Sequence, residues 1–300
     1  MADLTADLGF LKLKNPLLLA SGTCGYGAEL ADLLDLNRLG GIVVKGISLE
    51  PRAGNPPPRV FETPCGLLNA IGLENVGVER FLAVKLPWLR QLECAVVVNI
   101  LGSSVEEYAQ VAEKLSGQEG IAALEVNISC PNVKEGGAAF GASAELAARV
   151  TRAVKAAADL PVIIKLSPNV TDVCEIARAV EDAGADAVSL INTLLGMAID
   201  IERRRPVLGN VFGGLSGPAI KPVALRMVWQ TARCVKIPVI GIGGIATWQD
   251  AVEFLMAGAS AVQVGTATLV EPSRAEKILD GLERFMEAKG VSSLMSLKIT

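Results

Sequence analysis

A cysteine stands at the end of one strand-like segment of the sequence. In LEVNISCPNVKEGGAAFG, residues 124–141, apolar and polar residues alternate up to Ser129, and Cys130 follows directly. Such alternation is typical of a β-strand. A thiol there can act as a nucleophile or as a proton acceptor once it is activated. The chain has no histidine, which excludes Ser-His-Asp triads, Cys-His pairs and histidine-based metal sites.

Two lysines also occur inside strand-like segments. Lys45 and Lys165 each follow three or four apolar residues, and lysine is rarely buried without a partner. A solvated strand end would explain either lysine alone. Two cations at one face of a protein indicate an anionic or electron-rich ligand between them.

Two further strand-like segments end in glycine. Gly243 and Gly244 close PVIGIGG, and Gly265 and Thr266 close AVQVGT. Glycine lets the backbone approach a ligand closely, and the N–H groups of a following helix bind anions. Tight turns also use glycine, but the two loops together predict a phosphate site.

These residues stand at the ends of eight apolar segments. The segments are 16–22, 41–47, 95–100, 123–129, 161–167, 187–192, 238–244 and 261–266. Each is followed by a helical pattern, which is clearest at 104–116 and 142–157. The patterns at 172–186 and 247–260 each run into a glycine, as the end of a helix requires. Eight such units in 300 residues predict an α/β fold, a (β/α)8 TIM barrel. A doubly wound sheet is the alternative, but the first strand ends in ASGTCGYG, which lacks the G-x-G-x-x-G spacing.

Three other segments complete the expected architecture. Residues 4–16 predict a short hairpin across the bottom of the barrel, and residues 48–75 and 193–218 predict long loops over the active site. We expect a single domain over residues 1–300. Its active site would lie at the carboxyl ends of the strands, where Ser21, Asn99, Asn127 and Asn192 supply further polar groups.

Composition restricts the class of protein. The formal net charge of -4 disfavours a nucleic-acid surface, and no apolar run approaches the roughly 20 residues that span a bilayer. None of the six cysteines forms a C-x-x-C pair, so we expect no zinc or iron–sulfur site on this chain. Cys94 and Cys174 are expected to be small buried residues. These features predict a reduced, cytoplasmic location without a membrane segment.

Nine motifs give the sequence a family resemblance. They are ASGTCGYG (20–27), VVKGIS (43–48), NAIGLEN (69–75), VNISCPNV (126–133), IIKLSPN (163–169), INTLLGMAIDI (191–201), GGLSGPAIKP (213–222), GIGGI (241–245) and VQVGTA (262–267). In their order and spacing the chain resembles the dihydroorotate dehydrogenase family over nearly its whole length. The resemblance implies oxidation of (S)-dihydroorotate to orotate in the synthesis of UMP, with hydride passing to one flavin mononucleotide (FMN) per chain.

The resemblance also implies a role for each motif residue. The implied FMN residues are Ala20, Ser21, Lys45, Gly46, Asn99, Asn127, Lys165, Ile191, Gly217, Gly243, Gly244, Gly265 and Thr266. The implied substrate residues are Lys45, Asn69, Ala70, Ile71, Gly72, Leu73, Asn127, Asn132, Asn192 and Thr193. Cys130 would be the catalytic base that takes a proton from C5, and Lys165 would lie beside the flavin ring.

The loops resemble one type within this family. The membrane-bound type has serine where this chain has Cys130, and it carries an N-terminal membrane helix that we do not expect here. CPNVKEGGAAFG and INTLLGMAIDIERRRPVLGN resemble the class 1B, NAD-linked catalytic subunit. This type implies a partner subunit with FAD and a [2Fe-2S] cluster, and a homodimer of this chain within a heterotetramer. The basic run 201–206 could face that partner, although such runs are more often solvated loops.

Three alternatives remain open from the sequence. A homodimeric, fumarate-linked dihydroorotate dehydrogenase shares the cysteine, and a dihydropyrimidine dehydrogenase-like flavin oxidoreductase shares the flavin domain. Outside this class, a flavin-free phosphosugar lyase or isomerase also combines a barrel with a phosphate site.

Overall fold

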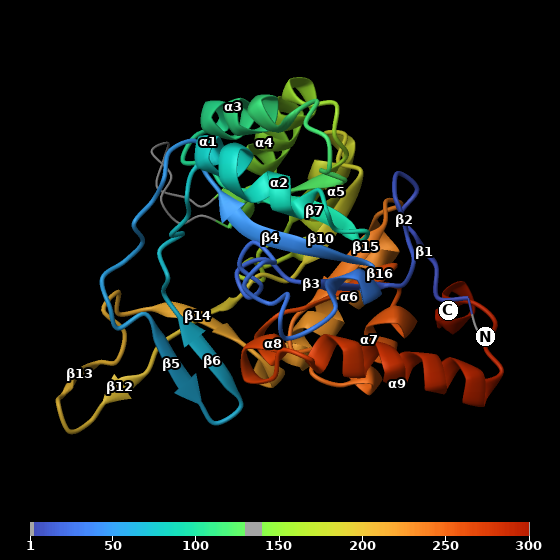
Figure 1. Ribbon diagram of the computed structural model, residues 1–300. Coiled ribbons are helices and arrows are strands. Elements are labelled where there is room, and N and C mark those ends of the chain that lie inside the picture. Colours follow the sequence, from blue (N-terminus) through green and yellow to red (C-terminus); the bar gives the residue numbers. More distant parts are fainter. Residues whose placement is uncertain (1–2, 130–139, 300) are drawn as a thin grey trace.

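A closed barrel of eight parallel strands forms the centre of the computed structural model, which describes residues 3–129 and 140–299 (Figure 1). The barrel strands are β3 (Leu17–Leu19), β4 (Gly41–Ile47), β7 (Ala95–Ile100), β8 (Ala123–Asn127), β9 (Val162–Lys165), β10 (Ala187–Leu190), β15 (Val239–Ile242) and β16 (Ala261–Val264). They pair in chain order, and β16 closes the barrel against β3. Each lies within one of the eight apolar segments, so the predicted (β/α)8 barrel is confirmed.

A ring of helices covers the outside of the barrel. The longer ones are α3 (Val105–Leu115), α4 (Ala144–Ala157), α5 (Val173–Asp182), α6 (Lys221–Cys234), α7 (Trp248–Met256) and α9 (Arg274–Lys289). Side-chain caps fix where several begin: Ser104 caps α3, Asp172 caps α5, and Thr247 forms a capping box with Asp250 at α7. Each cap satisfies backbone N–H groups that have no partner within the helix. The four helical patterns in the sequence are confirmed.

The first strand departs from the expected strand–helix pattern. Between β3 and β4 the chain forms turns and the short helix η1 (Leu36–Arg38) in place of an α-helix. Gly22, Gly25 and Gly27 have φ values of +89°, +57° and +90°, which a right-handed helix does not allow. The prediction of a helix after every strand was therefore wrong for this unit.

The two long loops contain strands of their own. Strands β5 (Val60–Thr63) and β6 (Gly66–Asn69) come from the first loop, and β11 (Leu194–Gly196) and β14 (Gly213–Ser216) from the second. They form one antiparallel sheet in the order β11–β14–β6–β5. Figure 1 shows this sheet, with the hairpin of β12 (Ile199–Asp200) and β13 (Arg205–Pro206), beyond the carboxyl ends of the barrel strands.

The remaining elements are short. At the amino end of the barrel, β1 (Ala6–Asp7) and β2 (Lys12–Leu13) pair antiparallel, which confirms the predicted hairpin (Figure 1). The other helical segments are α1 (Val78–Arg80), η2 (Phe81–Lys85), α2 (Leu86–Leu89), η3 (Phe140–Ala142), η4 (Pro218–Ile220), α8 (Thr266–Val270) and η5 (Leu294–Leu297). Among the described helices, none combines the length and the apolar composition that crossing a lipid bilayer requires.

Candidate active site

A buried carboxylate lies inside the barrel, below the ends of the strands. Glu125 of β8 has no exposed surface, and four side chains donate to it. Asn99 Nδ2 and Lys165 Nζ donate to Oε1 over 2.8 and 3.4 Å, and Ser189 Oγ and Gln263 Nε2 donate to Oε2 over 2.8 and 2.7 Å. The donors come from β7, β9, β10 and β16, so five of the eight strands meet at one charge.

Both predicted lysines lie near the carboxyl ends of their strands. Lys165 is 6% exposed, while Lys45 is half-buried, and burial lowers the pKa of Lys45 below its ordinary value. Gly46, next to Lys45, packs against Asn99, and Asn99 and Lys165 both donate to Glu125 Oε1, so the two lysines share one end of the barrel. Burial raises the pKa of Cys24 to about 12, so this thiol stays protonated at neutral pH.

Asparagine side chains at the ends of two strands that flank β9 are hydrogen-bonded to each other. Asn192 Nδ2 donates to Asn127 Oδ1 over 3.2 Å, and the backbone of Ser129 donates to the same oxygen. Thr193 N donates in turn to Asn192 Oδ1 over 2.8 Å. In the register of β8 and β9, Asn127 lies directly opposite Lys165. The structure thus brings together predicted substrate residues and the lysine predicted to contact the flavin ring.

The predicted phosphate residues lie where backbone segments approach closely. A Cβ atom on Gly244 would lie 2.8 Å from the backbone nitrogen of Lys221, and one on Gly217, which is predicted near the flavin ring, would lie 2.9 Å from Gly66 Cα. Gly243, Gly244, Gly265 and Thr266 are all partly exposed, so a ligand can reach their backbone. Thr266 Oγ1 donates to Ser216 Oγ over 2.8 Å and thereby joins α8 to the long second loop.

The remaining predicted cofactor residues line the strands around this rim. Ala20 follows β3 and donates its backbone N–H to Val264 O, and Ser21 lies half-buried in the next turn. Ile191 is buried, with its backbone N–H donating to Ile242 O. Gly46 has a packing role, because a Cβ atom there would lie 2.7 Å from Asn99 Oδ1.

The predicted substrate loop is held by the segment that precedes it. Asn55 N donates to Ile71 O, and Asn55 Nδ2 donates to Ala70 O, each over 3.0 Å. Gly72 and Leu73 both have positive φ, at +76° and +59°, so the loop makes a sharp left-handed turn. Positive φ is uncommon for leucine and clusters at functional sites.

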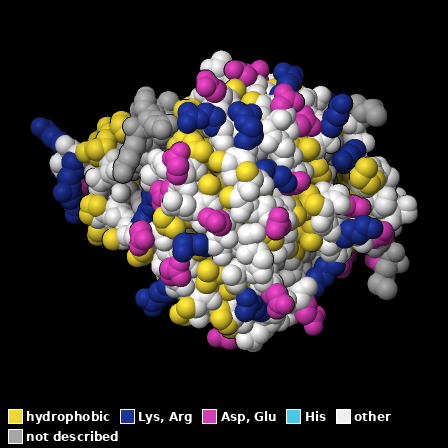
Figure 2. All heavy atoms as spheres, turned by 90° about the horizontal axis from the view of Figure 1, so that it is seen from above, with side chains coloured by type: hydrophobic (Ala, Val, Ile, Leu, Met, Phe, Trp, Pro, Cys, Tyr) yellow, Lys and Arg dark blue, Asp and Glu magenta, His cyan; other side chains and the backbone are white. Residues whose placement is uncertain are grey.

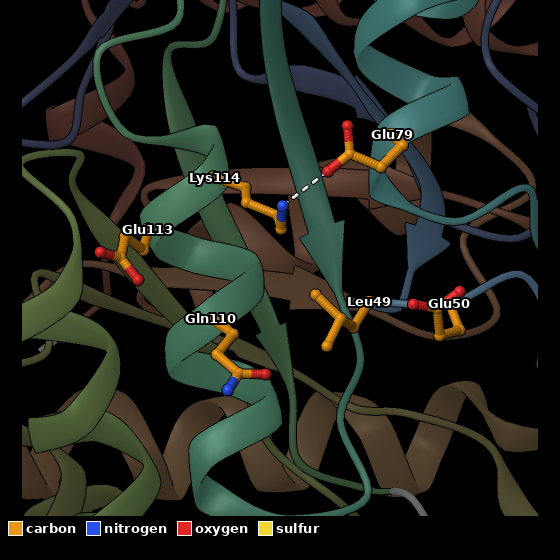
Figure 3. Close-up of a pocket in the computed structure, with 6 residues that line it drawn as sticks. All are labelled: Leu49, Glu50, Glu79, Gln110, Glu113 and Lys114. Atoms are coloured by element: carbon orange, nitrogen blue, oxygen red, sulfur yellow. Dashed lines mark hydrogen bonds and ion pairs between the residues drawn. The ribbon is translucent and has the colours of Figure 1, made fainter.

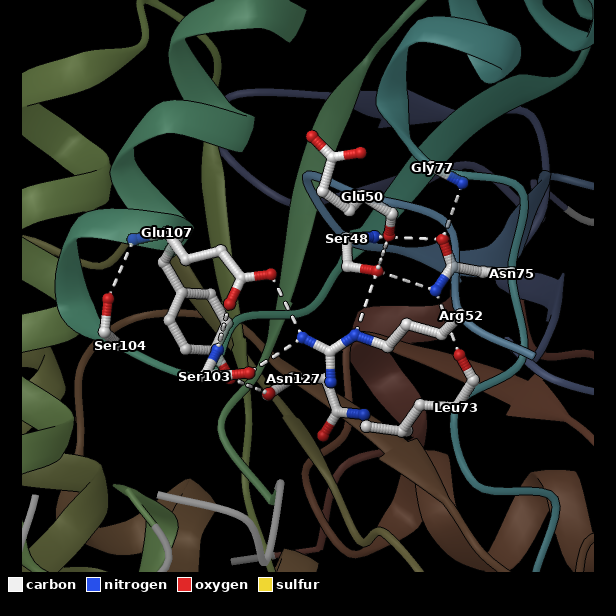
Figure 4. Close-up of polar contacts among 11 residues, drawn as sticks. Ser48, Glu50, Arg52, Leu73, Asn75, Gly77, Ser103, Ser104, Glu107 and Asn127 are labelled. Carbon is white, nitrogen blue, oxygen red and sulfur yellow. Dashed lines mark hydrogen bonds and ion pairs between the residues drawn. The ribbon is translucent and has the colours of Figure 1, made fainter. Parts of the chain in front are cut away.

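A polar network fixes the base of the same loop to the neighbouring helix (Figure 4). The guanidinium group of Arg52 donates to Ser48 Oγ, Ser103 Oγ and Glu107 Oε1 over 2.9–3.1 Å. Asn75 donates to Ser48 Oγ over 2.8 Å and accepts from Ser48 N. The network connects the segment after β4, the segment after β7 and α3, so the loop has a defined position above the barrel.

Asn69 belongs to the sheet that covers the barrel end. Its Nδ2 donates to Gly214 O over 3.2 Å, and the two residues are paired in the register of β6 and β14. A Cβ atom on Gly214 would lie 2.1 Å from Thr193 Oγ1. The two long loops therefore carry Asn69 and Thr193 to the same place.

The comparisons with known proteins agree with this geometry. A family model described as "Dihydroorotate dehydrogenase" matches residues 4–286. The chain belongs to the dihydroorotate dehydrogenase family. The family resemblance drawn from the nine motifs is thereby confirmed.

Individual members of the family are similar over the whole chain. A protein of Geotalea uraniireducens named "Dihydroorotate dehydrogenase B (NAD(+)), catalytic subunit" is 57% identical over 295 residues, which cover 98% of this chain and 97% of that protein. A protein of the same name from Bacteroides thetaiotaomicron is 54% identical over 297 residues, 99% of this chain and 98% of the other. The crystal structure of DHODH from Eimeria tenella in complex with ferulenol is similar to this chain, with a TM-score of 0.80 and 21% identity. The match covers 98% of this chain and 87% of the Eimeria chain, and it supports the fold alone.

The predicted base Cys130 and the predicted substrate residue Asn132 lie outside the described residues. Of the two cysteines expected to be buried, Cys94 is 6% exposed, which confirms that expectation, whereas Cys174 is partly exposed at the start of α5.

A hollow on the outside of the barrel has a different character (Figure 3). It lies between α1, α3 and the segment after β4, and Glu50, Glu79, Glu113 and Lys114 line it. Lys114 donates to Glu79 over 2.6 Å, so its charge is already paired. The excess of carboxylates makes this hollow unsuited to a phosphate or a carboxylate ligand.

Sequence reasoning missed Glu125 and Gln263. Both occupy positions inside buried strands of a barrel interior that is usually filled by branched apolar side chains. The available signal was a single glutamate inside ALEVNIS, an otherwise apolar strand buried on both faces. A charge at such a position indicates a partner within the fold.

Proposed function

We propose that this protein oxidises (S)-dihydroorotate to orotate in pyrimidine biosynthesis and passes the electrons, through FMN and a partner subunit with FAD and a [2Fe-2S] cluster, to NAD. The observation that carries the proposal is the convergence of Lys45, Lys165, Asn127 and Asn192 at one end of a barrel of this family. The proposal takes residues 1–300 as one FMN-binding domain and places the protein in the cytoplasm.

The residues at the barrel end fit FMN. The partly exposed glycines at 243, 244 and 265 leave room for a phosphate at the backbone, and Thr266, whose hydroxyl group donates to Ser216 Oγ, directly follows Gly265. Lys165 has three N–H donors and uses one on Glu125, so further donors are available to a flavin ring. Ala20, Ser21, Asn99, Asn127, Ile191 and Gly217 would complete the cofactor site, and bound FMN would supply the acceptor for a hydride from C6.

The chain's own residues would bind and deprotonate the substrate. The Lys45 ammonium suits the substrate carboxylate, because half-burial of the lysine strengthens its attraction to an anion. The amides of Asn69, Asn127, Asn192 and, by proposal, Asn132 offer donors and acceptors together, as a pyrimidine ring requires. In this proposal the proton at C5 passes to the Cys130 thiolate, so that the C–H electrons remain to form the C5–C6 double bond as hydride leaves C6.

A surface beyond the barrel end supports the proposal of a partner subunit. The second loop exposes Leu195, Ile199 and Ile201 by 70%, 60% and 79%, and Arg203 to Arg205 follow them directly. Figure 2 shows hydrophobic and basic side chains together at the end of the molecule where the β12–β13 hairpin lies. Exposed apolar side chains with a charged rim are typical of a protein–protein interface.

Assays of the isolated chain and of the reconstituted complex test the function. Reconstituted with FMN, the chain alone should oxidise dihydroorotate with an artificial dye as electron acceptor but not with NAD. Addition of the FAD- and iron–sulfur-containing subunit should confer NAD reduction. Turnover of NAD by the isolated chain would contradict the two-subunit proposal, and efficient reduction of fumarate would assign the chain to the homodimeric type.

A further inference from the structure

Glu125 is a charged residue for which the proposed reaction has no role. It is fully buried, and burial of a charge is costly unless donors surround it. The structure supplies four donors from four different strands. Since a barrel interior is ordinarily filled by apolar side chains at no such cost, the carboxylate calls for an explanation beyond packing.

The two oxygens of Glu125 serve different sets of residues. Oε1 accepts from Asn99 and Lys165, the two donors that the sequence places in the cofactor site. Oε2 accepts from Ser189 and Gln263, which belong to no predicted site. One oxygen therefore accepts from residues of the proposed flavin site, and the other anchors the carboxylate within the barrel.

The ion pair with Lys165 is enclosed. The Lys165 side chain is 8% exposed and that of Glu125 is 0% exposed, so water screens the pair very little. The carboxylate offsets the positive charge of the ammonium. Within the described part of the chain only its Oε1 accepts from Lys165, so other N–H groups of the lysine have no partner there. Glu125 can thus fix the orientation of the Lys165 ammonium and the net charge of the ion pair.

We propose that Glu125 is a positioning residue that holds the Lys165 ammonium and, as its counter-charge, sets how strongly the barrel favours reduced over oxidised flavin. This inference rests on the proposed FMN site. Reduction adds negative charge to a flavin, so a net positive group beside it stabilises the reduced form. With Glu125 present, the lysine and the carboxylate together are neutral, which moderates that stabilisation.

The test compares a variant that removes the charge of Glu125 with a variant that removes one hydrogen bond to its Oε2. Glu125→Gln removes the charge and keeps the shape, whereas Ser189→Ala, the matched control, removes one donor to Oε2 and keeps the charge. FMN affinity is measured by titrating flavin-free protein and following flavin fluorescence, and the midpoint potential is measured on the loaded protein. We expect Glu125→Gln to increase the ratio of reduced to oxidised flavin at fixed potential about tenfold, which for a two-electron couple is an upward shift of about 30 mV. Ser189→Ala should leave the potential unchanged.

Several outcomes decide the inference. The inference would be overturned if the midpoint potential of Glu125→Gln is unchanged or lowered, or if it shifts no more than that of Ser189→Ala. If the carboxylate merely supports the fold, the two variants should change the potential to the same extent. If Glu125→Gln does not fold, Glu125→Asp, which keeps the charge but withdraws it from Lys165 by one methylene, should shift the potential upward by a smaller factor. An unchanged potential in Glu125→Asp would overturn the inference as well. Failure of the wild-type chain to bind FMN would instead overturn the proposed function.

Discussion

Asn192 and Asn127 are hydrogen-bonded to each other, with 3.2 Å between Asn192 Nδ2 and Asn127 Oδ1. Asn127 ends β8 and Asn192 follows β10, and β9 with Lys165 lies between these two strands. The bond fixes the orientation of both amides before a ligand arrives. Side chains held in this way lose little conformational freedom on binding, which favours affinity.

Removal of the Asn192 amide, which is assigned to the substrate alone, should therefore weaken substrate binding more than flavin binding. For Asn192→Ala we expect the KM for dihydroorotate to rise roughly 10-fold, since a neutral hydrogen bond contributes about 0.5–1.5 kcal/mol and the Asn127 amide also loses its partner. Steady-state kinetics with a dye acceptor measure this. Asn210→Ala, at an exposed position beyond the barrel end, is the control and should behave as wild type.

The glycine at position 244 provides a test of the proposed phosphate site. Gly244 and Gly184 both have positive φ, at +74° and +95°, so alanine strains the backbone at either position, by roughly 1 kcal/mol. A Cβ atom would meet Lys221 at position 244 but nothing within 4 Å at position 184. Gly244→Ala should lose more stability than Gly184→Ala in denaturant unfolding, because its Cβ would also clash with the Lys221 backbone, and only Gly244→Ala should lose FMN affinity. Equal FMN affinity in the two variants would contradict a phosphate site at Gly244.

An ion pair beside that glycine should make stability depend on acidity. Lys221 Nζ donates to Asp250 Oδ1 over 2.7 Å, and the backbone of Ala246 and Thr247 donates to Oδ2. Burial acts to raise the pKa of Asp250, but these bonds together hold it below the ordinary value of 3.8. A carboxyl group whose pKa is lower in the folded state stabilises the fold above its unfolded pKa, and this contribution is lost as the pH falls through the folded pKa.

Asp250→Asn should thus destabilise the protein at neutral pH by about 1–3 kcal/mol, the range for hydrogen bonds to charged groups and for buried groups left unpaired. The difference between variant and wild type should shrink below the ordinary aspartate pKa of 3.8, where the wild-type carboxyl is progressively protonated. Denaturant unfolding across this pH range measures it. A difference that stays constant with pH would show that the charge of Asp250 is not responsible.

The architecture was predictable from the sequence where burial imposes a pattern. The eight barrel strands are continuous apolar runs because both of their faces are buried, and the helices between them show one apolar face. The pairing of β6 with β14 could not be recognised in the same way. Leu68 and Leu215 are paired across about half of the chain, and both segments appear in the sequence as loops rich in glycine and proline. Non-local pairing of short strands depends on the barrel that brings them together.

The candidate site was predictable for a different reason. Strand ends are exposed on one side of a barrel, so polar residues such as Asn127 and Lys165 interrupt an apolar run there and can be recognised. Glu125 also interrupts such a run, but it points into the barrel, where its partners Ser189 and Gln263 come from distant strands. The sequence does not reveal which strands share an interior layer until the closure of the barrel is known.

Lys45 should show a conflict between stability and function. Burial lowers its pKa, so the charged form is disfavoured in the folded state and costs stability at neutral pH. That cost decreases as the pH rises towards the ordinary lysine value of 10.5, where the unfolded chain also loses the proton. Lys45→Met should therefore raise the unfolding free energy by about 1 kcal/mol, a size typical of single stabilising substitutions.

The same variant should lose affinity for dihydroorotate, because methionine offers no charge to the substrate carboxylate. Lys12→Met, at an exposed position in the hairpin at the amino end of the barrel, controls for the general effect of losing a lysine. A variant that is no more stable than wild type and binds dihydroorotate normally would contradict both the energetic cost of Lys45 and its assignment to the substrate.

Cys130 is the residue on which the proposed proton transfer depends, and Cys130→Ser should separate chemistry from binding. Serine is a far weaker base than cysteine at neutral pH, so reduction of bound FMN by dihydroorotate should slow about 10²–10⁴-fold, the usual contribution of a general acid–base group. Affinity for FMN and for orotate should persist, because oxygen replaces sulfur without loss of a ligand contact. Rapid-mixing measurements of flavin absorbance give the rate directly.

The rate of flavin reduction in Cys130→Ser should still increase with pH in the range where the wild-type rate is already constant, since the serine hydroxyl group loses its proton at a higher pH than the thiol. Cys65→Ser, which replaces an exposed thiol, should react as fast as wild type; equal rates in all three proteins at neutral pH would remove Cys130 from the proposed mechanism.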